Sequence, residues 1–174
     1  MVKKKSTKST KATYGSAWFM LAVTRISLGL IFVWAFLDKT FGLGFATPAA
    51  KAWVNGGSPT SGFLMGASQG SGPFAGFFGA LSGSAVIDLL FMLALAGVGT
   101  ALVLGIGLRV AAVAGGLLML MMWAAVLPLE NNPVLDDHII YAMLLFVVAF
   151  GRRELSLASW WISQPYVKKH SWLW

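Results

Sequence analysis

The chain has 174 residues, of which 57% are apolar and only 11% are charged. About a quarter of the residues of a soluble domain are charged, so this composition indicates one compact integral membrane domain rather than a soluble protein. The net charge of +7 does not indicate nucleic-acid binding, because the basic residues gather at the two ends of the chain, as they do beside membrane spans.

The beginning of the chain predicts a basic head followed by a first span. Residues 1–15 are rich in Lys, Ser and Thr, and we expect them to be a disordered head on the cytoplasmic side. A basic head before an apolar run is also typical of a signal peptide. The run 17–37, however, is longer than the apolar part of a signal peptide and contains Arg25. We therefore predict a retained span, which ends in Asp38-Lys39.

The stretch 41–85 is rich in Gly, Ser and Pro, with scattered Phe and Trp, and is too broken for a spanning helix. We predict a short helix at 49–54 and an interfacial or re-entrant segment at 73–81. Long connections without regular structure are usually functional or disordered. The aromatic residues favour a lid over the outer mouth of the helices.

Three further apolar segments follow, at 85–104, 110–127 and up to Phe150. The last one opens with Asn132 as a predicted N-cap and Pro133 in the first helical position. This start places the acidic pair and the histidine of the segment in the second turn of the helix, namely Asp136, Asp137 and His138.

These segments predict an all-α fold: an integral membrane four-helix bundle of residues 16–151 with a long extracytoplasmic loop between the first and second helices. Residues 152–174 combine Trp with basic residues and are expected to form a cytoplasmic interfacial tail. The head, Arg109 and the tail are basic and lie on one side of a four-span chain. The positive-inside rule therefore predicts that both termini are cytoplasmic.

Four titratable residues are the catalytic candidates: Asp38, Asp88, Asp137 and His138. They come from three helices and all fall at the predicted outer end, where an ionisable group usually faces the bundle interior or a wet cavity. Asp88 and Asp137 lie near helix N-termini, which favour anions, so a structural role remains an alternative for them. Asp38 lies at a helix C-terminus and needs a partner, for which Lys39 and His138 are the candidates.

Arg25 is predicted to lie about 12 Å inside the first span, level with Thr100 and Tyr141. It either snorkels or binds backbone carbonyls, or it donates to the polar head group of a ligand. The ligand-binding candidates on the same helices are Arg25, Trp34, Lys39 and Tyr141.

Several kinds of redox and catalytic chemistry are excluded or disfavoured. The chain has no cysteine and so has no disulfide, thiolate nucleophile or dithiol relay. Haem is not expected, because His138 is the only histidine in a span and a membrane haem usually has two axial ligands. The acidic residues near His138 offer metal ligands, but no spacing fixes a geometry, so no metal is expected either.

Segments 25–39 and 104–109, the Gly-rich outer loop and the last helix with Asp137-His138 resemble the DoxX/DoxD family of small prokaryotic membrane proteins. The resemblance covers most of residues 17–150. It implies a four-helix membrane fold in the plasma membrane of a prokaryotic cell.

DoxD-type members of that family belong to a thiosulfate:quinone oxidoreductase, and DoxX-type members are linked to sulfur and oxidative-stress metabolism. The resemblance thus implies a quinone-interacting oxidoreductase subunit, in which the acid–base candidates exchange the protons of quinone reduction. Because the chain lacks cysteine, either a second redox subunit supplies the sulfur chemistry or the donor reacts directly with bound quinone. The alternative is a non-catalytic membrane scaffold of a redox complex. The expected partners are the lipid bilayer and a membrane quinone, and a homo-oligomer is left open.

Overall fold

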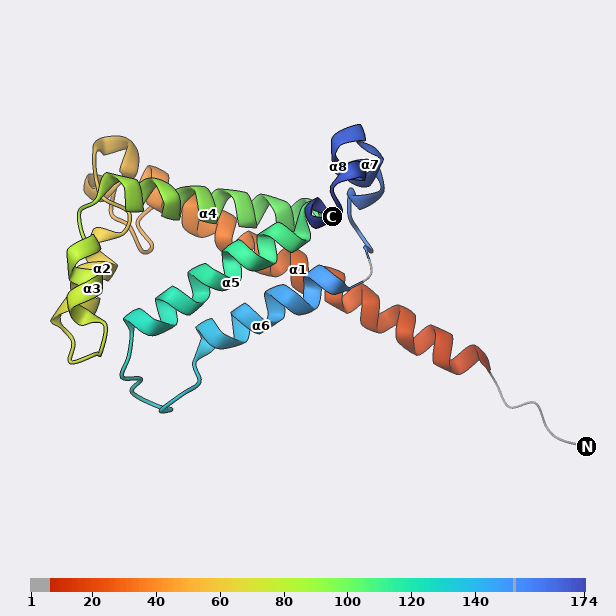
Figure 1. Ribbon diagram of the computed structural model, residues 1–174, viewed down its shortest axis with the longest axis horizontal. Coiled ribbons are helices and arrows are strands. Elements are labelled where there is room, and N and C mark those ends of the chain that lie inside the picture. Colours follow the sequence, from red (N-terminus) through yellow and green to blue (C-terminus); the bar gives the residue numbers. More distant parts are fainter. Residues whose placement is uncertain (1–6, 152) are drawn as a thin grey trace, which may run out of the picture.

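The computed structural model describes residues 7–151 and 153–174, with side chains described from Gly15 onward. Within these residues the protein is all-α and has no strand. Its long helices are α1 (Thr7–Phe41), α4 (Ala85–Leu104), α5 (Leu108–Ala125) and α6 (Asp137–Phe150). Helix α1 packs against α4 and α5 packs against α6, while α4 and α5 join the two pairs (Figure 1).

Three segments of the described chain are long and apolar enough to cross a membrane: Gly15–Phe41, Ala85–Leu104 and Leu108–Ala125. The prediction of an all-α fold with helices long and apolar enough to span a membrane is confirmed for these three segments. Helix α6 has 14 residues and rises about 21 Å, which is less than the roughly 30 Å of a bilayer core. The helix is shorter than predicted because it begins at Asp137 rather than at Pro133.

The two ends of the molecule differ in what they contain. One end holds the start of α1, the turn between α4 and α5, and residues 153–174; we call it the turn end (Figure 1). The other end holds the connections from α1 to α4 and from α5 to α6; we call it the loop end (Figure 1). The start of α1 and the end of the chain therefore lie at the same end of the molecule (Figure 1).

Glycines allow the closest helix contacts in the core. A Cβ atom on Gly29 of α1 would lie 2.9 Å from Leu102 Cβ of α4, and one on Gly99 would lie 2.9 Å from the backbone nitrogen of Val33. Close approach of backbones through small residues is the usual way in which membrane helices pack. The buried apolar core around this contact comes from all four long helices, with Leu28, Phe32, Met92, Leu95, Leu102, Met119 and Leu145 among its members.

The connection between α1 and α4 is ordered and partly helical, as predicted. It contains η1 (Ala49–Lys51), η2 (Trp53–Asn55), α2 (Ser61–Gln69) and α3 (Ala75–Leu81). The predicted segment 73–81 contains α3, one helix was predicted where η1 and η2 stand, and α2 was not predicted. Leu64 of α2 and Phe78 of α3 pack with Ala125 at the end of α5, so the connection covers the loop end.

The tail folds into α7 (Ala158–Ser163), α8 (Pro165–Lys169) and η3 (Ser171–Leu173). At the other terminus, α1 extends back to Thr7, so residues 7–15 are helical where a disordered head was predicted. A run without Pro, and without Gly before Gly15, offers no helix stop there. Residues 1–6, the rest of the predicted head, lie outside the described residues.

Candidate functional site

Asp38 is buried near the end of α1 and serves the loop that follows. Its Oδ1 accepts a hydrogen bond from the Phe45 N–H at 3.2 Å, and its Oδ2 accepts one from the Ala46 N–H at 3.0 Å. Gly42 adopts a positive φ of 64°, which turns the chain back toward the carboxylate. The hydrogen-bond partners of Asp38 are therefore backbone N–H groups. No ion pair between described residues joins Asp38 to Lys39 or His138, although Lys39, one of the two predicted partners, does interact electrostatically with the Asp38 charge.

Asp88, in the first turn of α4, holds a different part of the same connection. Its Oδ1 accepts hydrogen bonds from the Ser58 hydroxyl at 2.9 Å, the Thr60 N–H at 3.1 Å and the Thr60 hydroxyl at 2.6 Å. Asp88 and Thr60 are both buried. Three donors on one carboxylate oxygen offset the cost of burying its charge and fix the start of α2.

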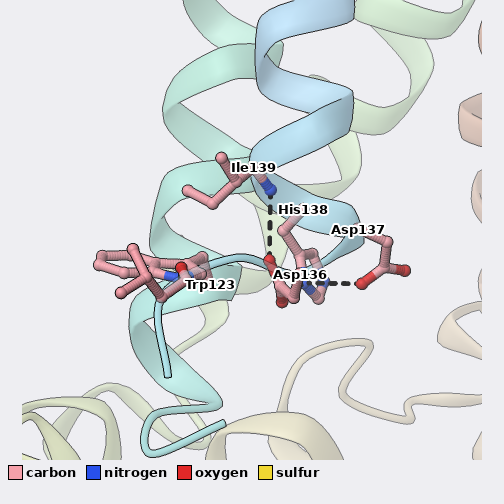
Figure 2. A network of polar contacts seen from close by, with 6 residues as sticks. Trp123, Asp136, Asp137, His138 and Ile139 are labelled. Atoms are coloured by element: carbon pink, nitrogen blue, oxygen red, sulfur yellow. Dashed lines mark hydrogen bonds and ion pairs between the residues drawn. The ribbon is translucent and has the colours of Figure 1, made fainter. Parts of the chain in front are cut away.

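At the start of α6, His138 lies between two carboxylates (Figure 2). Its Nδ1 is 2.7 Å from Asp136 Oδ2 and 3.6 Å from Asp137 Oδ1. Asp136 is the N-cap, because its Oδ1 accepts a hydrogen bond from the Ile139 N–H at 3.3 Å. The three side chains thus occupy the cap and the first turn, not the second turn as predicted.

The predicted cap residue Asn132 has another task. Its Oδ1 accepts hydrogen bonds from the N–H groups of Val134 and Leu135, both at 2.9 Å. This turn precedes the helix and is supported by the Trp123 indole N–H, which donates to the Val134 carbonyl at 3.0 Å. Asn132 and Asp136 are both residue types that cap helices well, and it is Asp136 that caps α6.

The pKa of Asp136 reflects this local arrangement. Burial raises the pKa of its carboxyl group, but the hydrogen bonds from His138 and the Ile139 N–H outweigh burial. The pKa therefore lies below its ordinary value of 3.8. One ligand atom from each of Asp136, Asp137 and His138 lies within 4.8 Å of the others, close enough to hold a cation. Helix capping and the Asp136–His138 contact already explain this cluster.

The catalytic candidates do not form a common network. No hydrogen bond or ion pair between described residues joins Asp38, Asp88 and His138 to one another. Asp38 and Asp88 form hydrogen bonds with the connection between α1 and α4, and His138 contacts Asp136 at the start of α6. Their shared depth at the loop end agrees with the sequence analysis, but their contacts are separate.

Arg25 lies at the turn end, far from the other candidates. It is 3% exposed, and its Nη2 donates to the carbonyl oxygens of Glu154 at 3.2 Å and Leu155 at 2.8 Å. Its Nη1 lies against Gly105, where a Cβ atom would come within 1.8 Å of that nitrogen. The prediction that Arg25 lies level with Thr100 is wrong. The Arg25 guanidinium lies beside Gly105, which follows the last residue of α4. Binding to backbone carbonyls was the structural alternative, and it is the one observed.

The remaining ligand candidates have different surroundings. Trp34 is 47% exposed, and its ring meets Phe45 edge to face at 5.1 Å. Tyr141 packs partly buried against the helix core. The Lys39 ammonium lies 5.8 Å from the centre of the Phe91 ring, and Lys39 is the one candidate that lines a cavity.

Two cavities lie at the loop end, each with a volume of about 540 Å³. The first, which we call the apolar cavity, lies between α2 and the end of α5; its lining includes Phe63, Gly66, Ala67, Leu127 and Pro128. The second, the lysine cavity, lies among the turns of the first connection; its lining includes Lys39, Ala46, Lys51, Asn55, Ser58 and Phe63. Gly62 and Phe63 line both cavities and form a shared wall.

The predicted site residues did not include Lys51, Ser58, Thr60 or Phe63. The only available signal was Ser58-Pro59-Thr60-Ser61, a run typical of a helix start that also carries hydroxyl donors for a carboxylate. No protein-family model, curated protein or solved structure matches this chain.

Proposed function

We propose that this chain is a quinone-interacting oxidoreductase subunit of a prokaryotic plasma membrane, with both termini in the cytoplasm and α6 as a fourth crossing segment. The observation that carries the proposal is the pair of cavities that share the Gly62–Phe63 wall at the loop end. Both have volumes in the range typical of small-molecule sites, about 300–1,000 Å³. Two adjacent sites suit a reaction between two different substrates.

The apolar cavity suits the quinone. Phe63, Leu127 and Pro128 offer apolar surface for a flat ring, and Gly66 and Ala67 leave room for it. No Lys, Arg, Asp or Glu lines this cavity. A quinone ring is uncharged and is carried on an apolar chain, so it gains free energy by entering such surroundings.

The lysine cavity suits an anionic electron donor. Lys39 and Lys51 line it, and no carboxylate does. The resemblance to the DoxD type suggests thiosulfate as the donor. Joining two thiosulfate dianions through a new S–S bond releases two electrons, and one quinone takes up these electrons with two protons to form the quinol. Only the Gly62–Phe63 wall lies between the two cavities, so in this proposal electrons pass from the donor to the quinone without a relay of cysteines.

In this proposal the buried acids are positioning residues rather than catalytic residues. Asp88 binds Ser58 and Asp38 binds Ala46, and both of these partners line the lysine cavity. The Asp136–His138 pair lies outside both linings, and we assign it to proton exchange at the outer surface.

Binding measurements on the purified chain test this assignment. Gly66 lines the apolar cavity, and a Cβ there would meet no atom within 4 Å, so Gly66→Leu introduces a side chain at the cavity wall. We expect this change to weaken binding of a short-chain quinone about tenfold or more. Gly76→Leu is the matched control, since Gly76 is equally open and lines neither cavity.

The variant Lys39→Met tests the lysine cavity independently of the apolar cavity. We expect it to weaken thiosulfate binding about tenfold while quinone binding stays unchanged, because it removes one of the two charges from the lysine cavity. His138→Ala should leave both affinities unchanged. Loss of quinone binding in His138→Ala, with none in Gly66→Leu, would move the site to the start of α6 and contradict the proposal.

A non-catalytic scaffold is the second candidate, and one observation favours it. Asp38 and Asp88 accept hydrogen bonds from donors within their own chain, and Arg25 donates through Nη2 to backbone carbonyls, as side chains with structural roles do. A scaffold would bind neither quinone nor thiosulfate and would instead co-purify with a redox subunit from native membranes. The same titrations distinguish the two functions.

A further inference from the structure

The tail is a folded unit attached to the ends of two candidate spans. The Leu157 N–H donates to the carbonyl of Leu104, the last residue of α4, at 2.9 Å. The N–H of Arg109, near the start of α5, donates to the carbonyl of Trp174 at 3.1 Å. Leu104 is the last residue of one candidate span and Arg109 lies near the start of the next, so the tail lies beside the ends of two candidate spans.

Contacts within the tail hold its shape. The Trp161 indole N–H donates to the Leu173 carbonyl at 2.8 Å, and the Trp174 indole N–H donates to the Val167 carbonyl at 3.1 Å. Val167 is buried. Two of the tryptophans are therefore occupied inside the tail, while others remain available at its surface.

The outward side chains of the tail are large aromatic residues. Trp160 is 57% exposed, Tyr166 65% and Trp172 56%. The His170 ring lies against the Tyr166 ring, with centres 4.5 Å apart and the ring planes tilted by 33°. Exposed Trp and Tyr beside a span are typical of side chains that lie among lipid headgroups.

The described residues of the tail and the adjoining start of α5 also carry four cations. Arg109 and Arg153 both lie over the Trp174 ring, at 5.9 Å and 5.8 Å from its centre. Lys168 and Lys169 are exposed on α8. The only acidic residue from 153 to 174 is Glu154, and none of these four cations forms an ion pair with a described carboxylate.

We propose that the tail binds the headgroups of anionic phospholipids in the leaflet at the turn end. The aromatic side chains enter the headgroup region, and the cations hold the lipid phosphates. Each lysine or arginine near an anionic surface adds roughly 1 kcal/mol to binding, so each lysine removed should lower the preference for anionic lipid about fivefold. The proposal does not depend on the quinone site, which lies at the opposite end.

The test uses the full chain in phosphatidylcholine nanodiscs that contain a small fraction of brominated lipid, which quenches tryptophan on contact. Brominated phosphatidylglycerol should quench more than the same fraction of brominated phosphatidylcholine, and high salt should abolish the difference. Lys168→Gln/Lys169→Gln should remove most of the difference. Neither lysine side chain has a described structural contact, so the fold should be unaffected.

Lys51→Gln is the control, because it removes a lysine at the loop end. It should leave the excess quenching by phosphatidylglycerol unchanged. Equal quenching by the two brominated lipids would overturn the proposal. So would an excess that survives the Lys168→Gln/Lys169→Gln substitution.

Discussion

Individual carboxylates in this protein fix loops. A buried carboxylate needs hydrogen-bond donors around it, and Asp38 and Asp88 take theirs from the connection between α1 and α4. The sequence predicted correctly that both acids lie at the loop end. It could not predict their donors, because Ala46 and Thr60 reach the acids only through turns that depend on the whole connection.

Asp88→Asn tests this role. The change keeps the shape of the side chain but removes the charge that three donors share, so we expect a loss of about 2 kcal/mol in the free energy of unfolding. The Thr60 N–H should also exchange with solvent faster. Asp137→Asn is the matched control, since the Asp137 side chain is 71% exposed, and it should cost less than about 1 kcal/mol. Equal losses in the two variants would show that burial of Asp88 carries no special stability.

The lowered pKa of Asp136 makes a prediction about pH. The folded protein binds fewer protons at this carboxyl group than the unfolded chain, so its contribution to stability is present above the ordinary pKa of 3.8. That contribution is lost as the pH falls through the lower pKa of the folded state. Asp136→Asn keeps a capping residue but cannot ionise.

Thermal unfolding of the wild type and Asp136→Asn across the pH range checks this. The wild type should be more stable at neutral pH, and the difference should shrink below about pH 4. A difference that grows on acidification would contradict the assignment.

Helices could be predicted well where a long apolar run decides them. The segments 85–104 and 17–37 lie within the observed helices, because apolar length alone marks a span. The start of α6 could not be predicted, since Asn132 and Asp136 are both good caps and the choice depends on contacts of Trp123. Helix α2 was missed because its glycines suggest a loop, although packing of Leu64 stabilises it.

The turn between α4 and α5 requires a glycine at position 105. Gly105 has a φ of 69°, and a Cβ there would collide with the Arg25 guanidinium. We expect Gly105→Ala to lower the free energy of unfolding by about 2 kcal/mol or more. Gly97→Ala is the control, because Gly97 lies in the middle of α4 with open space around it. It should be neutral or stabilise the helix by up to about 1 kcal/mol. If Gly105→Ala and Gly97→Ala changed the free energy of unfolding by similar amounts, the turn would not require a glycine at position 105.

The arrangement of the whole chain in the membrane can be tested with introduced cysteines, because the protein has none of its own. We predict that an impermeant thiol reagent added to intact cells labels Asn131→Cys, at the loop end. Ser163→Cys, at the turn end, should be labelled only after the cells are made permeable. Labelling of Ser163→Cys in intact cells would reverse the orientation and place both cavities on the cytoplasmic side.

The central claim is that the loop end binds a membrane quinone between α2 and the end of α5. The most direct measurement is crosslinking with a photoreactive quinone, followed by identification of the labelled peptides. We predict labels within the segments 62–71 and 125–128, which contain the residues that line the apolar cavity, and loss of these labels with excess unmodified quinone. Labels spread over the outer faces of the spans, or labels that excess quinone does not displace, would contradict the claim.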